Sequence, residues 1–167
     1  PYCDFNSHQS SREGLPEEAY IQALLQDLEH ELPHIWGRSV ETIFIGGGTP
    51  SLFQAVSIDK LLAGIRARVR LLPNAEITME ANPGTFERER FAGFAAAGVN
   101  RLSLGVQSFQ PEHLQALGRI HNDKQAITAI EAACKLFPRF NVDLMYALPK
   151  QSIEQAVRDV QTAIDLG

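Results

Sequence analysis

The chain alternates between short apolar runs and longer stretches whose apolar residues recur three and four positions apart. The short runs predict four strands, over residues 40–45, 76–79, 101–106 and 140–146. The spacing of the longer stretches is that of helices with one buried face. Pro16 suits the first turn of the first helix and Pro33 predicts its end, while Ser57 is the expected N-cap of the second. This pattern predicts strands and helices in strict alternation.

Three further helices have recognisable boundaries. The third is expected from Thr85 to Gly98, where a glycine can close the helix. The pairs Asn122 with Gln125 and Ser152 with Gln155 predict capping boxes, in which each side chain bonds the backbone of the other. They are expected to open the last two helices.

Strands that alternate with helices predict a parallel α/β sheet with right-handed crossovers. The apolar runs have the character of strands buried on both faces. An open doubly wound sheet and a closed barrel both fit this order. Linkers, low-complexity segments and short repeats are absent from the sequence, so residues 1–167 are expected to form one domain.

Polar residues and glycines follow every predicted strand. The first strand leads into Gly-Gly-Gly-Thr-Pro at residues 46–50, and Glu80, Gln107 and Asp143 stand at or near the ends of the others. In parallel α/β folds ligands bind at these carboxyl ends. Each motif taken alone fits an ordinary turn equally well, because glycine, proline and asparagine dominate turns. Four such motifs at one edge favour a ligand site.

The residue types at this edge restrict the ligand. The glycines would allow close approach to the backbone, but the lysine of a phosphate-binding loop and the Gly-x-Gly-x-x-Gly of a dinucleotide site are both missing. Glu80 and Asp143 could accept hydrogen bonds from an ammonium group or from ribose hydroxyls, and Gln107 could donate and accept. Arg119 could clamp a carboxylate. A small zwitterion such as an amino acid fits this set best.

Composition adds limits rather than a function. The net charge of −5 gives no general affinity for nucleic acid, and the sequence shows neither a membrane span nor a signal peptide. Two cysteines make no disulfide framework, which predicts a reducing, cytoplasmic location. Cys134 falls on an apolar helix face and is expected in the core. The start at Pro1 and the stop after a helix predict a fragment cut at both ends.

Several motifs together resemble a known family. Tyr2-Cys3 resembles the end of the radical S-adenosylmethionine (SAM) signature Cys-x-x-x-Cys-x-aromatic-Cys, and the glycine motif roughly 40 residues later resembles the superfamily's SAM-binding loop. Glu-x-Asn-Pro, Leu-Gly-Val-Gln-Ser-Phe and Asp-Leu-x-Tyr-x-Leu-Pro resemble the oxygen-independent coproporphyrinogen III oxidases and their relatives, the haem chaperones. The likeness extends over essentially the whole chain. It implies a partial (β/α)6 TIM-like barrel, of which this chain would hold about four strands and five to six helices, without the first and sixth strands and the C-terminal domain.

The resemblance also implies cofactors and site residues. Cys3 would be one of three cysteine ligands of a 4Fe-4S cluster, and this chain alone would not hold a complete cluster. The residues that would bind SAM are Tyr2, Gly47, Gly48, Thr49, Glu80, Gln107, Arg119 and Asp143.

Within the family, the segment Pro-Tyr-Cys-Asp-Phe-Asn-Ser-His is more similar to the haem chaperones, because the oxidases carry a further cysteine where Phe5 stands. The implied function is a chaperone that binds haem and delivers it to acceptor proteins, with membranes reached only through partners. The alternative is an oxidase that decarboxylates porphyrinogen propionates through a 5′-deoxyadenosyl radical. A barrel lyase or aldolase without a cluster is a third hypothesis, but no lysine ends a strand for Schiff-base chemistry.

Overall fold

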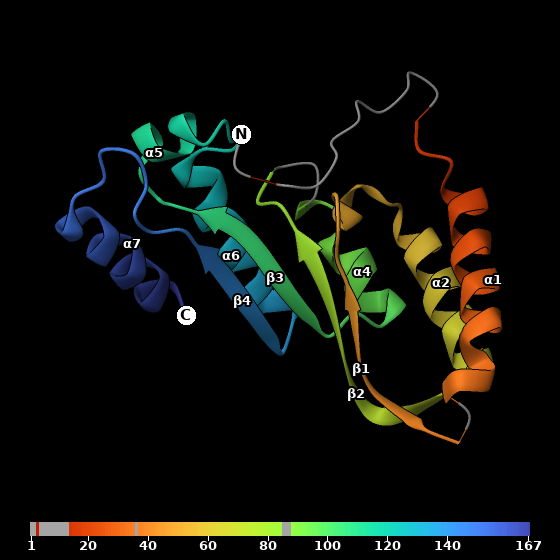
Figure 1. Cartoon of the computed structure of the whole chain (residues 1–167). Coiled ribbons are helices and arrows are strands. Elements are labelled where there is room, and N and C mark those ends of the chain that lie inside the picture. Colours follow the sequence, from red (N-terminus) through yellow and green to blue (C-terminus); the bar gives the residue numbers. More distant parts are fainter. Residues whose placement is uncertain (1–2, 4–13, 36, 85–87) are drawn as a thin grey trace.

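Four parallel strands form a single sheet in which the strand order follows the chain order (Figure 1). The computed structural model describes residue 3 and residues 14–35, 37–84 and 88–167. The strands are β1 (Ser39–Ile45), β2 (Arg70–Ala81), β3 (Arg101–Gln107) and β4 (Arg139–Leu144). A doubly wound sheet reverses its strand order at a switch point, whereas this sheet does not. The observed order therefore favours the barrel.

Six α-helices and one short 3-10 helix lie in the described part of the chain. They are α1 (Glu17–Ile35), η1 (Pro50–Leu52), α2 (Ala55–Arg68), α4 (Phe91–Ala97), α5 (Pro111–Ala116), α6 (Asp123–Leu136) and α7 (Ile153–Leu166). Helices α2, α4 and α6 pack against the sheet, and α1 packs on α2 as an outer helix (Figure 1). None of the helices that the structure describes is long and apolar enough to cross a membrane.

The main core lies between the sheet and this helix layer. Towards the carboxyl end of each strand every second residue belongs to it, and in β3 these are Leu102, Leu104 and Val106, all without exposed surface. The intervening residues of β2, β3 and β4 carry mostly polar side chains. Because successive residues of a strand point to opposite faces, the second face of the sheet is polar. The expectation that these strands are apolar on both faces is therefore wrong.

The helix boundaries confirm the capping boxes and correct two other predictions. Both the Asn122 box and the Ser152 box are formed in full. Helix α2 begins before Ser57, with Gln54 as its N-cap. Helix α1 runs past Pro33. Proline removes one backbone hydrogen bond, and this costs little so close to the end of a helix.

The third predicted helix is confirmed at its C-terminal end. Gly98 closes α4 with a φ of 107°, in the left-handed region that glycine adopts readily. Its predicted start at Thr85 lies outside the described residues.

Candidate functional site

The polar face of the sheet ends in a row of polar groups at the carboxyl ends of the strands. The strand register pairs Glu80 with Ser103 and Ser103 with Asn141. Further along, Asn82 follows the end of β2, and its Oδ1 lies 3.6 Å from the position of a Cβ atom at Gly105 in β3. Glu80, Gln107 and Asp143 are each half-buried. The edge that was predicted to bind a ligand is thus formed by adjacent strands.

The glycine loop after β1 contacts Glu80 directly. The Gly47 N–H donates to Glu80 Oε2 at 3.1 Å. A Cβ atom at Gly46 would lie 2.9 Å from the Phe44 ring and 3.1 Å from the Glu80 carboxyl carbon, so a side chain there would displace the carboxylate. Gly47 has a φ of 123°, which side-chain-bearing residues rarely adopt. The loop needs glycine both for its path and for the position of Glu80.

Two further residues of the glycine motif lie beside this contact. Gly48 is exposed, with open space where a side chain would stand. The Thr49 hydroxyl donates to the Gly48 carbonyl at 2.7 Å and precedes the short helix η1. The side of the loop at Gly48 is therefore open to a ligand.

Arg119 joins the ends of β2 and β3. Its Nη2 donates to Asn82 Oδ1 at 2.8 Å and to the Gly105 carbonyl oxygen. A Cβ atom at Gly105 would meet both the Gln107 amide nitrogen and Arg119 Nη2, at 3.1 and 3.2 Å. The Gln107 side chain and the guanidinium therefore converge over Gly105. This brings two of the predicted site residues together.

Asp143 is held by neutral donors on the polar face. Ser103 Oγ lies 3.2 and 3.1 Å from its two carboxylate oxygens, and Asn141 Nδ2 donates to Oδ1 at 2.6 Å. Asn141 Nδ2 also contacts Ser103 Oγ, at 3.2 Å. These hydrogen bonds fix the carboxylate in place without an ion pair.

His121 contacts the backbone near the end of β3. Its ring is buried, and Nε2 contacts the Val106 carbonyl oxygen at 3.1 Å, which requires the tautomer that donates from Nε2. Burial lowers the pKa of His121 below its ordinary value of 6.5; the hydrogen bond to Val106 opposes this shift and the Arg119 charge adds to it. The neutral ring is the form that fits this position.

The proposed cluster end of the site is described only in part. Cys3 is an exposed free thiol, and Tyr2 lies outside the described residues. Among the residues that the structure describes, no three His, Cys, Asp or Glu side chains are grouped as metal ligands would be. A thiolate is the ligand that a 4Fe-4S cluster takes, so Cys3 fits one cluster position and this part of the chain supplies no more.

Cys134 is exposed, so its predicted place in the core is wrong. The apolar face of α6 that contacts the sheet is formed by Ala126, Ala129, Ile130 and Ala133, and Cys134 lies beside that face rather than within it.

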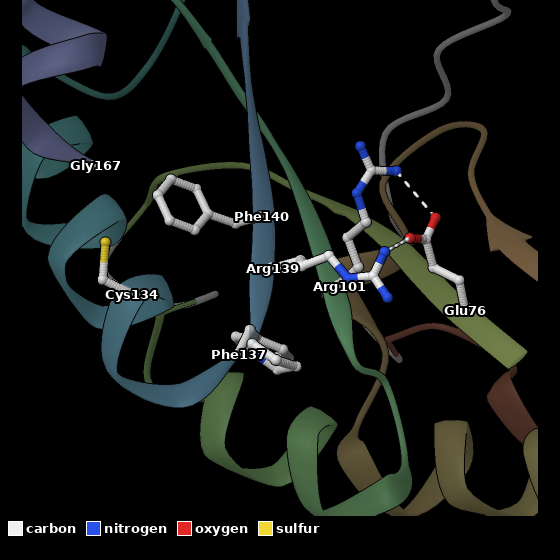
Figure 2. Close-up of a pocket in the computed structure, with 8 residues that line it drawn as sticks. Glu76, Arg101, Cys134, Phe137, Arg139, Phe140 and Gly167 are labelled. Carbon is white, nitrogen blue, oxygen red and sulfur yellow. Dashed lines mark hydrogen bonds and ion pairs between the residues drawn. The ribbon is translucent and has the colours of Figure 1, made fainter. Parts of the chain in front are cut away.

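Cys134 lines a hollow of about 610 Å³ at the amino-terminal ends of β3 and β4, together with Glu76, Arg101, Phe137, Pro138, Arg139, Phe140 and Gly167. Figure 2 shows Cys134 and Phe140 on one side of β4 and the charged side chains on the other. None of the predicted SAM residues that the structure describes lines this hollow.

Sequence reasoning missed the residues that support the site. Ser103 and Asn141 contact Asp143, Asn82 contacts Arg119, and none of the three was singled out. A period of two was available as a signal, since polar residues alternate with apolar ones along β2, β3 and β4. It was overlooked because parallel strands were expected to be apolar on both faces.

Comparison with known proteins places the chain in a family. Residues 1–163 match the family profile of the Radical SAM superfamily. The chain is 53% identical to the haem chaperone HemW of Escherichia coli and 50% identical to that of Haemophilus influenzae, in each case over 99% of this chain and 44% of the relative. It is 39% identical to the mitochondrial radical S-adenosyl methionine domain-containing protein 1 of Bos taurus, over 96% of this chain and 36% of that protein. The chain thus spans less than half the length of these relatives.

Solved structures agree with this placement. The coproporphyrinogen III oxidase HemN from Escherichia coli, a radical SAM enzyme, superposes with a TM-score of 0.84 at 30% identity, over 99% of this chain and 38% of that one. The Elp3 protein of Methanocaldococcus infernus superposes with a TM-score of 0.60 at 20% identity, over 84% of this chain and 37% of that one, which shows the fold alone. The partial TIM-like barrel and the family resemblance are both confirmed, and the chain belongs to the radical SAM superfamily.

Proposed function

We propose that the full-length protein containing this chain is a haem chaperone built on a radical-SAM core. The observation that carries the proposal is the row of half-buried polar groups at the carboxyl ends of β1 to β4, in a chain about half identical to haem chaperones over nearly all of its length. Haem is the proposed cargo, and an acceptor protein is the proposed partner. The proposed location is the cytoplasm.

The SAM site of this proposal lies along that row. Glu80 and Asp143 would accept hydrogen bonds from the ammonium group or the ribose hydroxyls of SAM, because their partners in this structure are neutral donors and not cations. Gln107 and Arg119 converge over Gly105 and would contact the remaining polar groups of SAM. The open side of the glycine loop at Gly48 and Thr49 would allow the methionine part to approach the backbone.

Cys3 would hold one iron of a 4Fe-4S cluster, with Tyr2 beside the adenine of SAM and two further cysteines supplied by the full-length protein. When bound, the cluster supplies one electron that cleaves SAM to methionine and a 5′-deoxyadenosyl radical. The residues of this chain bind and orient SAM and exclude water around it.

The second candidate is an oxygen-independent coproporphyrinogen III oxidase. The superposition on HemN favours it, at a TM-score of 0.84. Its 30% identity is well below the 53% and 50% to the two haem chaperones, which favours the chaperone.

Anaerobic reconstitution of the full-length protein with iron and sulfide distinguishes the two candidates. We expect SAM binding by calorimetry, stoichiometric haem binding by visible absorption, and no formation of protoporphyrinogen from coproporphyrinogen III. Turnover of coproporphyrinogen III would establish the oxidase instead, and a reconstituted protein that binds neither SAM nor haem would overturn both proposals.

A further inference from the structure

Helix α7 carries a buried carboxylate, although apolar side chains of the same helix are exposed. Asp159 has only 2% of its surface exposed, while the apolar Val157, Val160 and Ile164 on the same helix are mostly exposed. A carboxylate is costly to bury unless it is fully hydrogen-bonded. The partners of Asp159 therefore indicate what it is for.

Asp159 bonds the segment that directly follows β3. Ser108 Oγ donates to Asp159 Oδ2 at 2.7 Å, and the Phe109 N–H donates to Oδ1 at 2.9 Å. The Gln110 N–H in turn donates to Ser108 Oγ at 3.1 Å. Ser108 is fully buried and Phe109 nearly so. Both carboxylate oxygens are used as acceptors, which an amide in the same place could not reproduce.

This segment starts immediately after Gln107. Gln107 has a φ of 71°, a left-handed conformation that costs free energy for a residue with a side chain and persists only where neighbours enforce it. On one side its carbonyl oxygen accepts from the Met145 N–H at 2.8 Å. On the other, Asp159 holds the next two residues. The side chain of Gln107 then folds back over Gly105, towards Arg119.

We propose that Asp159 is a positioning residue of the SAM site: by binding Ser108 and Phe109 it fixes the backbone of Gln107 and so the place of the Gln107 amide. This inference rests on the proposed function. Asp159 acts through Gln107 and does not touch SAM. It also ties the last described helix to the end of β3, about 50 residues earlier in the chain.

The test compares Asp159→Asn with the unaltered full-length protein after anaerobic reconstitution. The substitution keeps the size of the side chain but replaces one accepting oxygen by an NH2 group, which then faces the Ser108 hydroxyl or the Phe109 N–H. We expect the dissociation constant for SAM to rise roughly tenfold, and the Phe109 amide to exchange its hydrogen faster. Ser108→Ala removes one of the two bonds and is the milder variant, usable where Asp159→Asn folds poorly.

Asn100→Ala is the matched structural control. Asn100 bonds the Ile77 N–H and the Ala75 carbonyl, at 2.8 and 2.9 Å, near the opposite end of the strands. This variant should lower thermal stability without changing SAM affinity. Adding Asp159→Asn to a Gln107→Ala protein should weaken SAM binding little further, because the two residues act on one contact.

Three results would overturn the inference while the proposed function stands: unchanged SAM affinity in Asp159→Asn and Ser108→Ala, unchanged exchange at Phe109 in both variants, or additive losses with Gln107→Ala. An unaltered protein that binds haem and its cluster but no SAM would overturn the SAM site itself, and the inference with it.

Discussion

Glu76 and Glu80 lie on the same face of β2, four residues apart, in different electrostatic surroundings. Glu76 is paired with Arg101 at 3.3 Å and with Arg139 at 3.2 Å (Figure 2). In the part of the chain that the structure describes, neither Glu80 nor Asp143 forms an ion pair, and their partners are a backbone N–H, a hydroxyl and an amide. At the amino-terminal end of the sheet the carboxylate is paired with arginines, and at the carboxyl-terminal end the carboxylates have neutral hydrogen-bond partners. This difference separates the end that stabilises the sheet from the end that can bind a cationic ligand.

Removing the charge of Glu80 should weaken SAM binding, whereas removing that of Glu76 should not. In the reconstituted full-length protein, Glu80→Gln should weaken SAM binding by about ten- to a hundredfold, since a hydrogen bond to a charged group contributes roughly 1.5–3 kcal/mol. Glu76→Gln, two pleats away on the same strand, should leave SAM affinity unchanged. Asp143→Asn should behave like Glu80→Gln.

Calorimetric titration with SAM measures these affinities, and circular dichroism confirms that each variant is folded. Equal losses from Glu76→Gln and Glu80→Gln would contradict the separation of the two ends.

The next largest effect is a loss of stability at Asn100, whose side chain hydrogen-bonds the backbone of Ala75 and Ile77 in β2. Asn100→Ala should lower the free energy of unfolding by about 2 kcal/mol, because it leaves two backbone groups of β2 without partners. Urea unfolding measures the loss. The exposed Asn74, on the same strand, gives a control: Asn74→Ala should change stability little. A comparable loss from both variants would show that the hydrogen bonds of Asn100 are not the cause.

A smaller stability effect is expected at the ion pairs of Glu76. Glu76→Gln should cost about 1 kcal/mol or less, because its partners Arg101 and Arg139 are partly or mostly exposed. Added salt should shrink the difference from the unaltered protein, since it screens exposed charges. Unfolding in low and high salt tests this, and a loss that salt leaves unchanged would indicate a packing role for Glu76.

The smallest effect is a pH dependence at His121. Its pKa is lower in the folded protein than the ordinary 6.5, so the unfolded chain takes up the proton first. The stability that the neutral ring contributes is present above this ordinary pKa and is lost as the pH falls below it. As the pH is lowered below 6.5, the melting temperature of the unaltered protein should fall more steeply than that of His121→Gln. The exposed His34 provides the control variant His34→Gln, which should keep the steeper dependence.

The parts of the fold that depend on neighbours in the chain were predictable. The four strands, both capping boxes and the glycine at the end of α4 follow from local spacing and from residue types with one dominant use. The same holds for the position of Glu80, because a parallel sheet places the residue after a buried run at its carboxyl edge. The strand bounds follow less well, because β2 already begins at Arg70 instead of Glu76 and β4 ends at Leu144 instead of Tyr146.

The parts that depend on distant neighbours were not predictable in this way. The role of Ser103 depends on its hydrogen bond to Asp143 on the next strand. The role of Asp159 depends on its hydrogen bond with a loop about 50 residues earlier in the chain. The predicted burial of Cys134 was wrong for the same reason. Its helical spacing could not show that this side of α6 lies beside the face that contacts the sheet. Spacing identifies a helix face, while the element packed against that face decides the burial.

The agreement between strand order and chain order also bears on how the protein folds. Each strand pairs with the strand that precedes it along the chain, so the sheet can grow by one strand and one helix at a time. On the ribosome the β1–β2 pair with α2 can therefore form before β4 is synthesised. Protection of nascent chains from protease should therefore begin once Ala81 has left the exit tunnel, and protection that waits for α7 would show that the sheet folds only as a whole.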